Sequence, residues 1–185
     1  YQDRALSLTI AGCGYGAERE KREKFRAESA AIAADIEAKG MADFTAGYGL
    51  GASRVQLLNK DPRAWRQFMA NFAAHDAKGS AKTLRNVQGQ RPSLYDLEDR
   101  LAKIAVPTLI VTGDEDFNCL QPSLFLKRVI PSSGLAMLPK TGHMINLEEP
   151  AACNQRVGDC IAVAESGRWG LRDPRANPNE LMRAR

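Results

Sequence analysis

Three short apolar stretches have the composition of strands buried in a sheet. They span residues 5–11, 106–112 and 135–138, and each runs into glycine, proline or polar turn residues. Segments with helical periodicity separate the three stretches. Because strands that alternate with helices usually pack side by side, the sequence predicts an α/β fold with a parallel sheet.

The chain between residues 17 and 92 has a helical pattern and no predicted strand. We expect a first helix over 18–39 that ends at Gly40. A second helix follows Asp61, its expected N-cap, and begins at Pro62. The apolar face of the first helix comprises Phe25, Ser29, Ile32 and Ile36, and that of the second comprises Trp65, Phe68, Met69, Phe72 and Ala73.

The later helices are predicted from the same periodicity. We expect Gly79-Ser80 to break the second helix and a further helical stretch to cover 80–88. Ser93 is the expected cap of a short helix, and residues 120–130 form another. The last helix is predicted over 147–165, and its first turn contains Glu148, Glu149 and Pro150.

The predicted sheet is small for the length of the chain. Three parallel strands leave an unpaired edge, so we expect either polypeptide outside this sequence or another subunit to complete the sheet. The first residue is Tyr1 rather than Met, which favours a fragment or a processed product.

Composition and charge exclude several classes of protein. The net charge is +4, but no basic stripe is interleaved with aromatic residues, so nucleic acid is not an expected partner. No apolar run approaches the roughly 18 residues that span a bilayer. The four cysteines show no Cys-x-x-Cys pair or metal spacing, and with no basic-then-apolar leader they favour reduced thiols in a cytoplasmic protein.

Candidate chemistry lies directly after two of the predicted strands. The turn 113–116 (Gly-Asp-Glu-Asp) follows one strand, and 140–143 (Lys-Thr-Gly-His) follows the next. Open α/β sheets place their active sites at this edge. A carboxylate there can accept a hydrogen bond from Nδ1–H of His143, which leaves Nε2 as a general base near neutral pH.

These two segments resemble the α/β-hydrolase superfamily. VPTLIVTGDED, residues 106–116, is similar to its acid-bearing strand and turn, and TGHMINLEEP, residues 141–150, is similar to its histidine loop and last helix. The resemblance implies that Asp116 is the acid and His143 the base, with Asp114 as a rival for the acid. It also implies this division of the chain: core strand and turn 1–16, helical cap 17–92, remaining core 93–168 and tail 169–185.

The resemblance implies hydrolysis of a small ester, lactone or related acyl substrate, without a metal or organic cofactor. Its nucleophile belongs on an upstream Gly-x-Ser-x-Gly elbow, which this sequence lacks. Gly51-Ala52-Ser53-Arg54-Val55 has no final glycine, and Gly79-Ser80 also follows no strand. We therefore expect residues 1–185 alone to be inactive, and whether the nucleophile is Ser or Asp stays open. The alternative is a non-catalytic binding or interaction protein with the same fold.

The glycine-rich turn at residues 12–17 fits a different function. Gly-x-Gly-x-x-Ala after a strand is the dinucleotide-binding pattern of an oxidoreductase, although here a charged helix start follows it. The preferred interpretation is that these glycines turn the chain closely past a pocket. Cys13 and Cys119 follow strand ends and are candidates to line that pocket, whereas His75 is expected at the surface.

Overall fold

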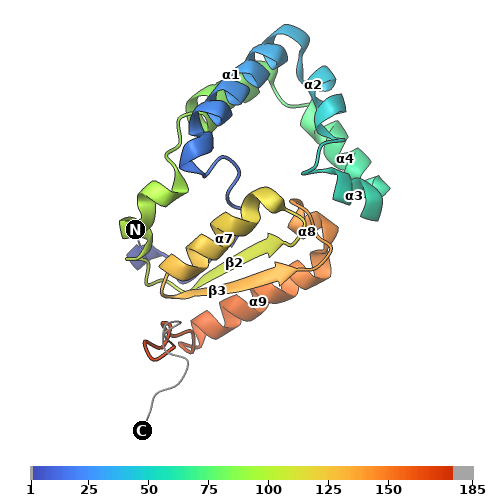
Figure 1. The fold of residues 1–185 in the computed structure, drawn as a ribbon. Coiled ribbons are helices and arrows are strands. Elements are labelled where there is room, and N and C mark those ends of the chain that lie inside the picture. Colours follow the sequence, from blue (N-terminus) through green and yellow to red (C-terminus); the bar gives the residue numbers. More distant parts are fainter. Residues whose placement is uncertain (1, 177–185) are drawn as a thin grey trace.

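The three predicted strands form one parallel sheet in the computed structural model, which describes residues 2–176 (Figure 1). They are β1 (Leu8–Ala11), β2 (Thr108–Gly113) and β3 (Ser133–Leu138), in the order β1-β2-β3. Ile10 pairs with Ile110, which pairs with Leu135. Every residue of β2 is buried, as the continuous apolar run predicted, and the α/β fold class is confirmed.

Helices cover both faces of the sheet and bury alternate residues of β2. On one face, Ile110 packs with Leu126 of α7 (Phe117–Val129). On the other face, Leu109 and Val111 pack with Cys153 and Cys160 of α9 (Pro150–Glu165). This alternation follows from the two-residue period of a strand and gives the sheet two apolar cores.

The helical block (residues 17–92) arches over α7 and reaches the far end of the sheet in Figure 1. Its elements are η2 (Arg19–Lys21), α1 (Arg22–Lys39), α2 (Met41–Tyr48), α3 (Val55–Lys60), α4 (Pro62–Ala73), α5 (Ala77–Thr83) and the π-helical turn η3 (Leu84–Gln88). An internal cluster that includes Ala33, Ile36 and Met41 holds α1, α2 and α5 together. None of the described helices is both long and apolar enough to cross a membrane.

Local signals set most helix boundaries as expected. The side chain of Asp61 accepts hydrogen bonds from the two backbone N–H groups at the start of α4, and Pro62 is the first residue of that helix. The predicted break at Gly79-Ser80 is wrong. Asp76 is the N-cap of α5 and accepts from the N–H of Gly79, so the break lies before Asp76 and Gly79 is inside the helix.

The end of the chain differs from the prediction in two ways. The predicted last helix is divided into α8 (Ile145–Glu148) and α9, because Glu149 precedes Pro150 and takes an extended φ of −137°. The start of the segment predicted as a tail, residues 169–185, is hydrogen-bonded to the core. The indole N–H of Trp169 donates to the carbonyl of Ser132 at 2.6 Å, and the backbone N–H of Arg172 donates to Pro131. Residues 177–185 of that predicted tail lie outside the described residues.

The remaining short elements connect the sheet to its surroundings. They are η1 (Gln2–Arg4), η4 (Leu94–Leu97) and α6 (Glu98–Leu101), and the last two form the single helix predicted after Ser93. The hydroxyl of Ser93 caps η4 by accepting from the N–H of Tyr95, as expected for a helix start.

Candidate active site

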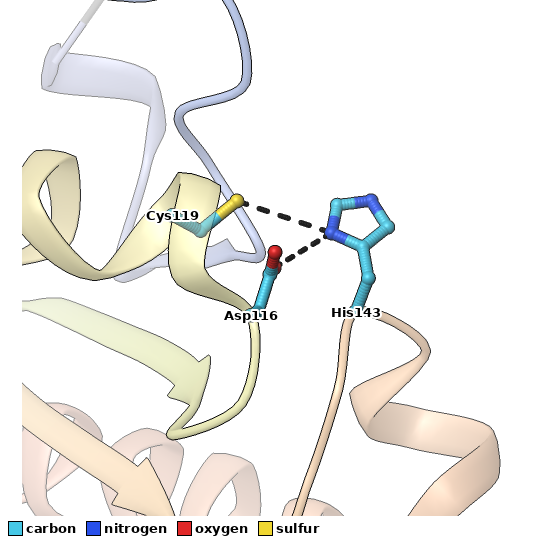
Figure 2. Close-up of side chains that lie close together, drawn as sticks. All are labelled: Asp116, Cys119 and His143. Atoms are coloured by element: carbon cyan, nitrogen blue, oxygen red, sulfur yellow. Dashed lines mark hydrogen bonds and ion pairs between the residues drawn. The ribbon is translucent and has the colours of Figure 1, made fainter. Parts of the chain in front are cut away.

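The structure brings Asp116 and His143 together at the carboxyl end of the sheet. Nδ1 of His143 lies 2.7 Å from Oδ2 of Asp116, within hydrogen-bond distance (Figure 2). Asp116 is 7% exposed, whereas the His143 side chain is 30% exposed, so one partner is enclosed and the other is open. The expected pairing of these two side chains is therefore observed.

Asp114, the rival acid, bonds to the neighbouring loop instead. Its carboxylate accepts a hydrogen bond from the backbone N–H of Thr141 at 3.1 Å. Gly113 allows the two loops to meet, because a Cβ at this position would lie 2.1 Å from the carbonyl oxygen of Thr141. Asp114 therefore ties the acid loop to the histidine loop, and the position facing His143 belongs to Asp116.

Glu148 holds the histidine loop from the other side. Its buried carboxylate accepts hydrogen bonds from the backbone N–H of Gly142 at 2.5 Å and of Met144 at 2.9 Å, the two residues that flank His143. Sequence reasoning missed this role, because it assigned Glu148 to the first turn of the last helix. The available signal was an acidic residue close behind the histidine.

The glycine-rich turn packs against the imidazole. Gly12 has a φ of +54°, and a Cβ there would meet Cε1 and Nδ1 of His143 at 3.3 Å. A Cβ on Gly14 would lie 2.5 Å from the ring of Pro122. These contacts require the absence of side chains, and the expectation that the glycines turn the chain past a pocket is confirmed.

That pocket is a cavity of about 730 Å³ between the helical block and the end of the sheet. His143 and Cys13 line it from the sheet side. Phe44, Tyr48 and Phe72 line it from the helical block, so part of its wall is aromatic, and Glu28 and Asp76 add polar groups to the same wall. Its size is in the range of small-molecule sites.

Three other residues, on or next to α4, occupy places that the sequence only partly indicated. His75 is exposed as expected, but it also lies at the edge of the cavity, where its ring packs against Phe72. Of the aromatic face of α4, Phe72 lines the cavity, whereas Trp65 donates its indole N–H to the carbonyl of Gly49.

Cys119 completes the immediate surroundings of the acid. It is fully buried, and its Sγ lies 3.9 Å from Nδ1 of His143. Burial alone would raise the pKa of Asp116, but hydrogen bonds from His143 and Cys119 outweigh burial and hold this pKa below its usual value. Burial, aided by the Asp116 carboxylate, raises the pKa of the Cys119 thiol well above its usual range.

The same three side chains have the spacing of a metal site, with donor atoms within 4.8 Å of one another. Ligand atoms about 2.0–2.2 Å from one tetrahedral metal ion lie more than about 3 Å apart, however, whereas Nδ1 of His143 and Oδ2 of Asp116 lie 2.7 Å apart and are hydrogen-bonded to each other. The donor set therefore fits a hydrogen-bonded acid and base better than it fits a metal ion.

The arrangement supports general-base chemistry. The hydrogen bond to Asp116 fixes a proton on Nδ1, so Nε2 is left to accept a proton at the cavity. Among the described residues, no serine or threonine hydroxyl is hydrogen-bonded to His143. Ser53 precedes α3 and Ser80 lies within α5, so neither follows a strand as an elbow serine does.

The comparisons with known proteins agree on the fold. No family model matches the chain. A protein of Agrobacterium fabrum (strain C58), provisionally named as the carbamate hydrolase RutD, is 30% identical over 122 residues, which are 60% of this chain and 45% of that protein. The chain thus spans less than half of this curated relative.

Two solved structures extend the likeness to most of the chain. MenH from S. aureus has a TM-score of 0.79 at 23% identity and is matched over 86% of this chain and 60% of its own. A thermophilic esterase from Thermogutta terrifontis has a TM-score of 0.71 at 19% identity, over 89% and 58%. With its parallel sheet and its Asp116 and His143 loops in place, the chain has the α/β-hydrolase fold.

Proposed function

We propose that this chain supplies the acid and the general base of a hydrolase that acts on small esters, lactones or related acyl compounds. The observation that carries the proposal is the buried Asp116 carboxylate, bonded to His143 at the wall of a cavity. The likeness to an esterase structure supports the reaction class.

In the proposed reaction, the nucleophile is a serine hydroxyl contributed by polypeptide outside residues 1–185. Nε2 of His143 accepts the hydroxyl proton while the serine oxygen attacks the acyl carbon. The imidazolium then returns the proton to the departing alcohol, and Asp116 stabilises the positive charge while it exists. A water molecule then attacks the acyl-enzyme while His143 accepts its proton, and His143 returns that proton to the serine oxygen as the carboxylic acid product leaves.

The test compares residues 1–185 with a longer chain that includes the residues encoded immediately upstream. A fluorophosphonate probe labels activated serines, and a 4-nitrophenyl ester reports turnover. We expect labelling and turnover only in the longer chain. General-base catalysis contributes about 10²–10⁴-fold, so His143→Ala in the longer chain should lower turnover by that factor.

The chain offers a matched control, because its only other histidine is His75. His75→Ala should keep probe labelling, since this exposed ring contacts Phe72 and not Asp116. Labelling of residues 1–185 that depends on His143 would show that the nucleophile lies within them. Ligand binding without turnover in either chain would favour a binding protein of the same fold.

A further inference from the structure

Arg54 is a buried cation at the wall of the cavity. It lies between α2 and α3, is 9% exposed, and is among the side chains that line the cavity with His143. Its guanidinium carbon lies 4.7 Å from the centre of the Tyr48 ring and 5.3 Å from that of Phe68. Two aromatic rings therefore fix the position of the charge.

The guanidinium has more hydrogen-bond donors than the protein satisfies. Nη1 donates to the carbonyl of Ser53 at 2.7 Å, and Nη2 donates to the hydroxyl of Tyr48. Nε is buried and has no partner within the described part of the chain. An arginine carries five N–H groups, so several donors of Arg54 are left without an acceptor.

No carboxylate among residues 2–176 lies within 4.0 Å of this guanidinium as an ion-pair partner. The acids near enough to influence it are Asp116 and Glu148, and both already accept other hydrogen bonds. Burial lowers the pKa of Arg54, which shows that its surroundings disfavour the charge. A buried charge is normally paired, so this one is arranged for a partner that residues 2–176 do not supply.

We propose that Arg54 binds a carboxylate group on the ligand of this cavity, so that the acyl substrate of the proposed hydrolase carries a negative charge remote from the bond that is cleaved. The inference that the ligand is an acyl substrate rests on the proposed function, whereas the inference that it is negatively charged rests on Arg54. A planar carboxylate matches the fork of a guanidinium with two parallel N–H···O bonds. The apolar part of the wall, with Phe44 and Phe72, suits an apolar chain between the two ends.

The first experiment measures binding to residues 1–185 and needs no turnover. Pentanoate and pentanamide have nearly the same size and shape, and only pentanoate carries the charge. We expect calorimetric titration to show that pentanoate binds at least about tenfold more tightly, which is within the range of a charge-assisted pair. Equal affinities, or no binding of pentanoate at millimolar concentration, would overturn the proposal without any variant.

Variants then assign the preference to one residue. Arg54→Met should abolish it, and Arg54→Lys, which keeps the charge but loses the fork, should keep part of it. Arg66→Met is the matched control, because Arg66 is exposed on α4 and should leave the preference unchanged. Arg91 also lines the cavity but donates to the carbonyl of Tyr15. A preference that is lost in Arg91→Met and kept in Arg54→Met would contradict the proposal.

A second experiment separates this inference from the proposed function. The longer chain is assayed with mono-4-nitrophenyl glutarate and with 4-nitrophenyl pentanoate, whose acyl groups have the same length. We expect kcat/KM to favour the glutarate about tenfold, and Arg54→Met to remove that ratio. Equal hydrolysis of both esters would support the proposed hydrolase and contradict the proposed carboxylate site. Charge-selective binding without hydrolysis of either ester would support the carboxylate site and contradict the proposed hydrolase.

Discussion

Asp116 shows how single contacts decide the charge state of a buried carboxyl group. Burial disfavours its charge, yet its pKa lies below the usual value because His143 and the Cys119 thiol both donate to the carboxylate. Cys119 is fully buried and kept protonated, so it acts as a fixed hydrogen-bond donor behind the pair. The Asp116 carboxyl group is therefore ionised at neutral pH.

We predict that Cys119→Ala weakens the fold above about pH 4, the usual pKa of Asp, by about 1 kcal/mol, because a buried carboxylate loses one donor. An acid whose pKa is lowered by folding adds stability above its unfolded pKa and loses it as pH falls through its folded pKa. The difference between wild type and Cys119→Ala should therefore shrink in acid. Denaturant unfolding at a series of pH values measures it.

Cys119→Ser is the control, because a serine hydroxyl keeps a donor of similar size at the same place. It should retain most of the stability that Cys119→Ala loses. If both variants lose the same free energy at every pH, Cys119 contributes only packing.

At the level of elements, the sequence predicted what periodicity and capping determine. The strands at 106–112 and 135–138, the cap Asp61 and the acid and histidine loops all follow from local patterns. The roles of Glu148 and Arg54 do not, because each depends on which distant backbone or ring lies beside the side chain. The amino-acid composition around a charged residue does not show whether the folded protein buries that residue.

Glu148 offers a direct test of how α8 positions the histidine loop. Glu148→Ala leaves two N–H groups in the histidine loop without an acceptor, and each such loss costs about 1–3 kcal/mol. We expect a marked drop in the free energy of unfolding and faster amide exchange at Gly142 and Met144. Urea unfolding and exchange monitored by NMR measure the two effects.

The neighbouring acid is the matched control. Glu149 forms an exposed ion pair with Lys60, and such pairs contribute about 0–1 kcal/mol. Glu149→Ala should therefore change stability little and leave exchange at Gly142 unaltered. If both variants lose a similar free energy of unfolding, negative charge near the start of α9 stabilises the fold, and the contact of Glu148 with the histidine loop does not.

At the scale of the whole molecule, β1 and β3 are the two edge strands of the described sheet. Near β3, Trp169 lies against a face of the sheet at Gly134 and donates its indole N–H to the carbonyl of Ser132. Within residues 2–176, no strand pairs with the outer edge of β1. An unpaired edge is a template for another strand, so we propose that a segment of the same polypeptide or a second copy of this chain occupies it.

The last prediction concerns that edge. The backbone N–H of Leu8 donates to the carbonyl of Pro107, directly before β2, and that of Gly12 donates to Val111 of β2. By the alternation along a strand, the N–H of Thr9 therefore points away from β2. Thr9→Pro removes that outward donor and keeps the pairing with β2, because proline is tolerated at an edge strand. We expect residues 1–185 to self-associate at tens of micromolar in analytical ultracentrifugation and Thr9→Pro to be shifted toward monomer. The backbone N–H of Ile10 faces β2, so Ile10→Pro removes a donor within the sheet and should instead destabilise the fold. A wild-type chain that is monomeric at every concentration and as stable as the longer chain would show that β1 needs no neighbour.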